Sequence, residues 1–148
     1  MSRLRRVLHP TDFSRASRAA FERAVEAAKA NRGELILLNV IAPTVLPIGD
    51  GYVSPKLYAE MEASARAYAQ RELAALIARA RKAGVRVTGL LMEGTAHVRI
   101  VQAARRKRAD LVVIGTHGRT GLARLFLGSV ASRVLATAPC PVLTVRGK

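Results

Sequence analysis

The chain has 148 residues; half are hydrophobic, only 4% are aromatic, and 25 Lys and Arg against 10 Asp and Glu give a formal net charge of +15. This length suggests one domain, residues 1–148, whose core must be built from Ala, Val, Leu and Ile. No apolar run is long enough to cross a membrane, the apolar part of the basic first ten residues is too short for a signal peptide, and a single cysteine, Cys140, excludes an intrachain disulfide. We therefore expect a cytoplasmic protein with no membrane partner.

Short apolar runs rich in β-branched residues alternate along the chain with longer stretches of helical period. In chain order they predict a strand at Arg3 to His9, a helix to about Asn31, a strand at Glu34 to Ile41, a helix at about Lys56 to Ala83, a strand at Val85 to Met92, a helix from Thr95 to about Lys107, a strand at Leu111 to Ile114, a helix at Phe126 to Ala136 and a strand at Val142 to Val145. This alternation predicts an α/β fold, a parallel sheet with helices on both faces and right-handed crossovers.

Three features mark the connections between the first predicted elements. Pro10 should end the first strand because it has no N–H for the ladder. Ser14, or Asp12 slightly earlier, can cap the helix that follows. The stretch Ala42 to Pro55 contains three prolines and predicts a long loop.

A glycine-rich stretch joins the fourth strand to the fourth helix, with glycines at 115, 118, 121 and 128. Glycine lets the backbone approach a ligand, and the N–H groups at the start of a helix favour an anion. No Gly-Lys-Ser/Thr follows, so this is not a Walker A loop, and the G-x-x-G-x-x-G spacing is not the dinucleotide fingerprint. From the glycines alone, a structural loop competes equally with an anion site.

The five-stranded order 3-2-1-4-5 makes the first and fourth strands neighbours. Ligands of such sheets bind beyond the carboxyl ends of the strands, where the strand order reverses. The turns Pro10 to Ser14 and Gly115 to Gly128 would then flank one crevice.

Basic residues dominate after Glu93, where Asp110 is the only acid against ten Lys and Arg. The densest cluster is Arg105 to Arg108. Such a cluster could attract nucleic acid or steer a phosphorylated ligand. The simpler interpretation is a solvated helix end, because no nucleic-acid motif and no interleaved aromatic residue accompanies it. Nucleic acid is thus an alternative partner and not the favoured one.

Taken together, the motifs resemble the universal stress protein family over essentially the whole chain. The resemblance rests on four segments: His9 to Ser14, Asp110 to Gly118, the pair Gly128-Ser129, and Ala138 to Val142. Gly115-x-x-Gly118, nine residues and then Gly128-Ser129 match the nucleotide-binding signature with which members typically bind ATP. The resemblance implies an adenine nucleotide alpha-hydrolase-like fold.

The resemblance also implies a site for ATP, with ADP or AMP as alternatives. Asp12 would accept hydrogen bonds from the nucleoside, Pro10 and Thr11 would line its pocket, and Val40 would contact adenine. The remaining implied residues, around the ribose and phosphates, are Ile114, Gly115, Thr116, His117, Gly118, Arg119, Gly128, Ser129, Val130 and Ala131. Mg²⁺ or Mn²⁺ would arrive on the phosphates. No protein metal site is expected, since the three histidines show no paired spacing.

We expect a nucleotide-responsive stress or signalling module with at most slow ATP hydrolysis, because no catalytic base stands beside the phosphate loop. Two alternatives are a small nucleotide hydrolase using the same crevice and a basic scaffold for nucleic acid or an acidic protein with a vestigial nucleotide site. The resemblance further implies a homodimer formed through the last strand, Val142 to Val145.

Overall fold

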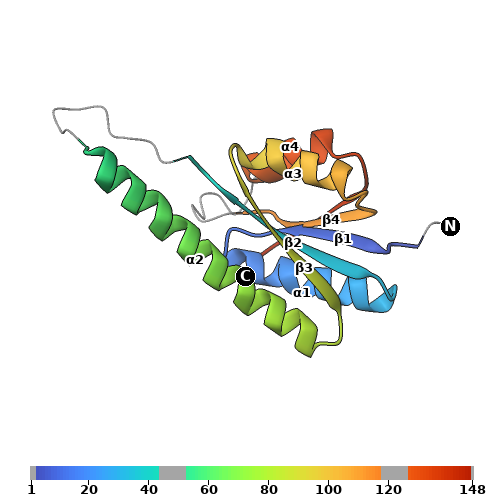
Figure 1. The fold of residues 1–148 in the computed structure, drawn as a ribbon. Helices are drawn as coiled ribbons and strands as arrows, with labels where there is room; N and C mark the ends of the chain where they lie inside the picture. Colours follow the sequence, from blue (N-terminus) through green and yellow to red (C-terminus); the bar gives the residue numbers. More distant parts are fainter. Residues whose placement is uncertain (1–2, 44–52, 118–126, 148) are drawn as a thin grey trace.

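The computed structural model describes residues 3–43, 53–117 and 127–147. Its elements in chain order are β1 (Arg6–Pro10), the 3₁₀ turn η1 (Arg15–Ser17), α1 (Arg18–Ala30), β2 (Glu34–Ile41), α2 (Pro55–Lys82), β3 (Arg86–Glu93), α3 (Ala96–Arg106), β4 (Leu111–Gly115), α4 (Ser129–Thr137) and β5 (Val142–Val145). The strands pair in parallel in the order β3-β2-β1-β4-β5 (Figure 1). The predicted sheet order is confirmed.

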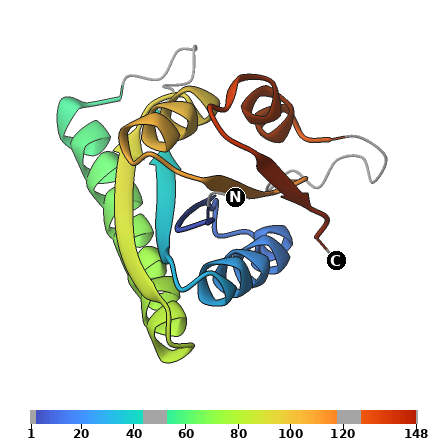
Figure 2. The ribbon, with the colours of Figure 1, turned by 90° about the vertical axis from the view of Figure 1, so that its right-hand side faces the viewer.

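Helices cover both faces of this sheet (Figure 2). On one face, α1 and α2 pack against a cluster that includes Val7 of β1 and Val113 of β4. On the other, α3 and α4 pack against a cluster that includes Leu8 and Val112. Successive residues of a strand point to opposite faces, so the central strands feed both clusters and read as continuous apolar runs.

The largest differences from the predicted boundaries are in β1, α1 and α4. β1 begins at Arg6 and includes Pro10, which lies beside Leu38 of β2 as the last residue of the strand. The Ser14 hydroxyl accepts a hydrogen bond from the Ser17 N–H at 3.2 Å and so caps η1, whereas α1 itself starts one turn later. The last helix begins at Ser129, because Gly128 is extended; Phe126 lies outside the described residues.

The long helix α2 packs on the sheet through its carboxyl-terminal half, where Leu73 and Ala80 are buried. Its first half projects past the sheet in Figure 1 and exposes apolar side chains, among them Leu57 and Met61. Among the described residues no helix is both long enough and apolar enough to cross a membrane.

A buried histidine joins β1 to β4 near the point where their ladder stops. The register pairs Val7 with Leu111 and Leu8 with Val112. Pro10 has no N–H to continue a ladder, and the His9 Nδ1 lies 2.8 Å from the carbonyl oxygen of Val113. Since that oxygen can only accept, Nδ1 carries the proton and donates. Nε2 is buried without a partner among the described residues, and burial lowers the His9 pKa to about 4.

This buried imidazole predicts a loss of stability on mild acidification. The unfolded chain takes up a proton near pH 6.5 and the folded chain only near pH 4, so the free energy of unfolding falls as the pH drops through that window. The contribution of His9 from pH 7 to pH 5 should be about 2 kcal/mol. Urea titrations at the two pH values should show this loss in the wild type and a smaller one in His9→Gln. An equally steep loss in the variant would contradict the assignment.

Candidate functional site

A cleft of about 340 Å³ opens beyond the carboxyl ends of the strands, between the turn after β1 and the start of α4. It brings together every described residue of the predicted site: Pro10, Thr11, Asp12, Val40, Ile114, Gly115, Thr116, His117, Gly128, Ser129, Val130 and Ala131. Gly118 and Arg119, which complete the predicted set, lie outside the described residues. Contact of these residues with a ligand stays a prediction.

Four further residues line the cleft and were missed by sequence reasoning: Ser17, Leu38, Ala96 and Ile100. Leu38 could have been found, because it stands two positions before Val40 and points to the same face of β2. Ala96 and Ile100 share one face of α3 at a spacing of four, but only the packing of α3 over the sheet brings them to the cleft. Ser17 lies at the cleft because of the 3₁₀ turn η1, which the sequence pattern does not predict.

The turn after β1 is held by hydrogen bonds within itself. The Thr11 hydroxyl accepts from the Phe13 N–H at 3.1 Å and lies 3.2 Å from the Ser17 hydroxyl. The Asp12 Oδ1 accepts from the Ser14 N–H at 2.9 Å. Phe13 has a φ of 64°, which the side-chain bonds on either side of it hold in place. These bonds set where the Asp12 carboxylate stands at the cleft.

The same turn is anchored to β2. The Thr11 N–H donates to the Leu38 carbonyl at 2.8 Å, and the Asn39 side chain donates to the Thr11 carbonyl at 2.8 Å. Thr11 and Asn39 are both buried. The first wall of the cleft is therefore built from β1 and β2 together.

The opposite wall joins the end of β4 to the start of α4. The Thr116 N–H donates to the Val145 carbonyl at 2.9 Å, and the Gly128 N–H donates to the Thr116 carbonyl at 2.7 Å. The Thr116 hydroxyl lies 2.8 Å from His117 Nδ1. Thr116 and Gly128 are well separated in the sequence but are in direct backbone contact. This contact places α4 against the end of β4.

The amino terminus of α4 faces the cleft. Its first intrahelical bond runs from the Ser132 N–H to the Gly128 carbonyl at 2.9 Å, so the N–H groups of Ser129, Val130 and Ala131 have no acceptor within the helix. Gly128, the N-cap residue, has no side chain that could accept hydrogen bonds from them. The described lining contains neither Lys nor Arg. An anion at this end would therefore be bound by backbone N–H groups and the Ser129 hydroxyl, with the helix dipole.

The lining of the cleft combines two kinds of chemistry. It includes the apolar side chains of Leu38, Val40 and Ile100 and the polar groups of Asp12 and Ser129. A ligand with a flat apolar ring and an anionic group fits such a pair of surfaces. Among the described residues, no group of three or more His, Cys, Asp or Glu side chains could hold a metal ion.

Comparison with known proteins matches nearly the whole chain to one family. A model of the universal stress protein family matches residues 3–146. A universal stress protein of Methanocaldococcus jannaschii is 36% identical over 144 residues, which cover 96% of this chain and 82% of that protein.

Solved structures agree with that match. The universal stress protein UspA from Lactobacillus plantarum has a TM-score of 0.84 at 26% identity, covering 99% of this chain and 100% of that one. A universal stress protein solved in complex with cAMP has a TM-score of 0.72 at 27% identity, covering 98% of each chain. The likeness confirms the expected adenine nucleotide alpha-hydrolase-like fold.

Two glycines of the cleft should respond differently to alanine. A Cβ at Gly128 would lie 2.7 Å from the Thr116 carbonyl oxygen, whereas the nearest atom to a Cβ at Gly115 is 3.6 Å away. The backbone of Gly128 (φ −58°) suits alanine, so the effect there is one of packing. We expect Gly128→Ala to lower the free energy of unfolding by about 1–3 kcal/mol. Gly115→Ala should change it by less than about 1 kcal/mol. Urea denaturation of the pair checks this, and equal stabilities would contradict it.

Proposed function

The chain belongs to the universal stress protein family, and we propose that it is a cytoplasmic, nucleotide-responsive stress or signalling module that binds ATP in the cleft between β1 and β4. The observation that carries the proposal is the pairing, in one cleft, of apolar lining residues with a helix terminus whose N-cap residue, Gly128, offers no side-chain cap. The relative solved with cAMP supports an adenine nucleotide as the class of ligand. The complete glycine signature, with its second pair at Gly128-Ser129, supports ATP within that class.

The cleft suggests one orientation for the nucleotide. The base would lie on the apolar wall beside Val40 and Ile100, the ribose near Asp12, and the phosphates at the amino terminus of α4, where the Ser129 hydroxyl adds a donor. The close fit of Gly128 against Thr116 keeps those N–H groups at the end of β4. Mg²⁺ or Mn²⁺ would be carried on the phosphates, and water and phosphate oxygens would supply most of its ligands.

We propose binding in preference to rapid turnover. The described lining holds one carboxylate, Asp12, and its Oδ1 accepts from the Ser14 N–H in the turn after β1. In the proposed orientation this group lies at the nucleoside, away from the phosphate that hydrolysis would attack. A water attacking that phosphate would have to be oriented by a residue placed at the phosphate end. Hydrolysis should accordingly be slow.

A single charge placed at the phosphate end tests this proposal. Ser129→Asp adds a carboxylate at the first position of α4, which the helix dipole tolerates in the absence of a ligand but which repels phosphate. We expect ATP affinity to fall by roughly tenfold or more and adenosine affinity to change by less than about threefold. Isothermal calorimetry with Mg²⁺ and each ligand measures both.

Ser132→Asp is the matched control, because Ser132 is an exposed residue of the same helix outside the lining of the cleft. It should leave ATP affinity nearly unchanged. If wild-type protein gives no heat with millimolar ATP, AMP or cAMP, or if both variants lose ATP equally, the proposed site is wrong.

We further propose a homodimer formed through β5. This strand pairs with β4 on one side and is an edge of the described sheet (Figure 2). Leu143 is 43% exposed, and Leu135 of the neighbouring α4 is also exposed. An apolar edge strand is a ready surface for a second strand, and antiparallel pairing about a two-fold axis satisfies its backbone groups.

Charge placed in the proposed interface should therefore separate the subunits. We expect Leu143→Glu to be monomeric at micromolar concentration, where the wild type sediments as a dimer. Leu57→Glu on α2 is the control, since Leu57 is similarly exposed, at 46%, and lies on another element. Sedimentation velocity distinguishes the forms. A wild-type monomer, or a Leu143→Glu dimer, would contradict the proposal.

A further inference from the structure

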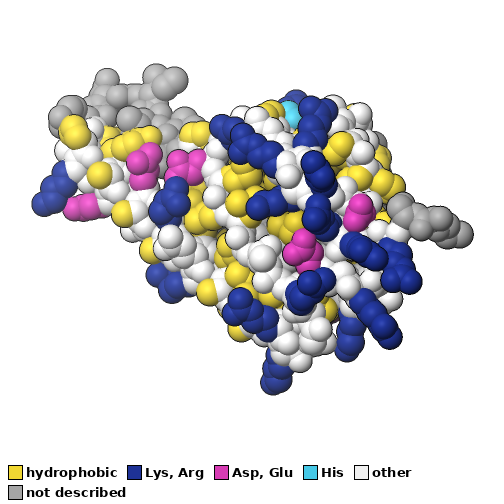
Figure 3. All heavy atoms as spheres, turned by 45° about the vertical axis from the view of Figure 1, so that its right-hand side comes forward, with side chains coloured by type: hydrophobic (Ala, Val, Ile, Leu, Met, Phe, Trp, Pro, Cys, Tyr) yellow, Lys and Arg dark blue, Asp and Glu magenta, His cyan; other side chains and the backbone are white. Residues whose placement is uncertain are grey.

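The edge of the sheet opposite the cleft gathers basic residues from several elements. In a parallel α/β sheet the strands begin and the helices end at the same edge. Arg6 of β1 lies beside Glu34 of β2, and Glu34 lies beside Arg86 of β3. α3 ends at this edge with Arg105 and Arg106 and continues into Lys107 and Arg108. Lys and Arg side chains far outnumber Asp and Glu on the face that Figure 3 shows.

We call the exposed side chains of Arg3, Arg5, Arg86 and Arg105 to Arg108 the basic edge. The dipole of α3 accounts for cations in its last turn, Arg105 and Arg106. It does not account for Arg3 and Arg5, which precede β1, or for Arg86, which begins β3. Clustered like charges repel, and the chain as a whole already carries +15.

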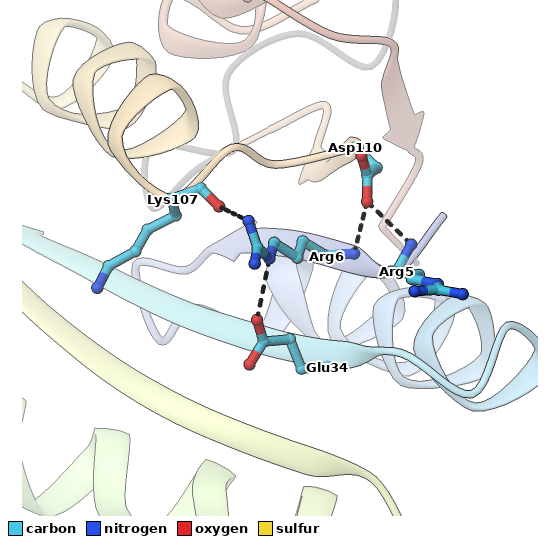
Figure 4. A network of polar contacts seen from close by, with 5 residues as sticks. All are labelled: Arg5, Arg6, Glu34, Lys107 and Asp110. Carbon is cyan, nitrogen blue, oxygen red and sulfur yellow. Dashed lines mark hydrogen bonds and ion pairs between the residues drawn. The ribbon is translucent and has the colours of Figure 1, made fainter. Parts of the chain in front are cut away.

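The acids at this edge are occupied by the chain itself (Figure 4). The Asp110 Oδ2 accepts from the backbone N–H groups of Arg5 and Arg6, both at 2.9 Å. Glu34 lies 3.4 Å from the Arg6 Nε. These two carboxylates therefore pair with the backbone and with Arg6, and they leave the arginines of the basic edge to solvent or a partner.

The same contacts fix the basic edge in place. The Asp110 N–H donates to the Arg6 carbonyl at 2.8 Å, and the Arg6 Nη1 donates to the Lys107 carbonyl at 3.4 Å. The turn after α3 is thereby tied to the backbone of Arg5 and Arg6 at the start of β1. Because the backbone that carries these cations is fixed, mainly side-chain entropy is lost when they meet a regular array of anions.

We propose that the basic edge binds the phosphate backbone of a nucleic-acid duplex. Its cations are mostly arginine, whose planar fork matches phosphate oxygens in pairs. The described aromatic side chains, Phe13, Phe21, Tyr58 and Tyr68, belong to other parts of the fold, so the edge offers no platform on which unpaired bases could stack. A duplex presents a dense row of phosphates without requiring stacking. Binding should therefore be strongly salt-dependent and independent of base sequence.

Fluorescence anisotropy with a labelled DNA duplex of about 20 base pairs tests this surface. We compare the wild type with the triple variant Arg105→Gln, Arg106→Gln, Arg108→Gln. At about 100 mM salt the triple variant should bind roughly tenfold or more weakly, and its plot of log affinity against log salt should be less steep by about two to three. Two duplexes of unrelated sequence should bind the wild type equally.

The matched control is Arg18→Gln, Lys56→Gln, Arg71→Gln, which removes the same charge from exposed positions on α1 and α2. It should weaken binding by less than about threefold. If the two triple variants lost equal affinity for the duplex, the effect would depend on net charge alone, and the proposal would be overturned. Tighter binding of single strands, of polyglutamate or of anionic vesicles than of the duplex would assign the edge to another partner and overturn it as well. Absence of wild-type binding at low salt would do the same.

Discussion

The pairing of β1 with β4 is the constraint on which the cleft depends. These strands are neighbours in the sheet, yet β1 leads into α1 on one face and β4 leads towards α4 on the other. The chain therefore turns towards one face of the sheet after β1 and towards the other face after β4. Neither turn covers the space between these two strand ends, and this space is the cleft. His9 holds the strands together just before they separate, through a side-chain bond to Val113 where Pro10 offers no N–H.

The same parallel arrangement gives the molecule two edges of different electrostatic character. Helix amino termini collect at the carboxyl edge of the sheet, where α4 offers backbone donors without any described Lys or Arg in the lining. Helix carboxyl termini collect at the amino edge, where the arginine side chains lie. In our two proposals each edge binds phosphate, but by a different means. The first edge is a cleft and suits a small ligand, whereas the second is exposed and suits an extended one.

Much of this could be predicted from the sequence, because the strongest signals are local. Buried strands are recognised in the sequence as apolar runs, and their alternation with helices predicts a parallel sheet. What could not be predicted depends on tertiary neighbours. Ile100 reaches the cleft only because α3 packs over β2. His9 looks like a polar residue at a strand end, and only the adjacent β4 shows that it donates to a carbonyl. The glycine spacing in the sequence likewise does not distinguish Gly115 from Gly128. Of these two, only Gly128 lies so close to a backbone atom, the Thr116 carbonyl oxygen, that an added Cβ would clash.

In the proposed site, Asp12 would combine a structural and a binding role in one side chain. Its bond to the Ser14 N–H belongs to the turn after β1, which suggests a purely local function. An ionised carboxylate, however, has about four acceptor sites on two oxygens, so a turn bond and a ligand bond are compatible. The turn bond orients the carboxylate, and Thr11 anchors the same turn to β2. A group fixed in this way would lose little freedom if a ribose hydroxyl donated to it, so the local role favours the proposed binding role.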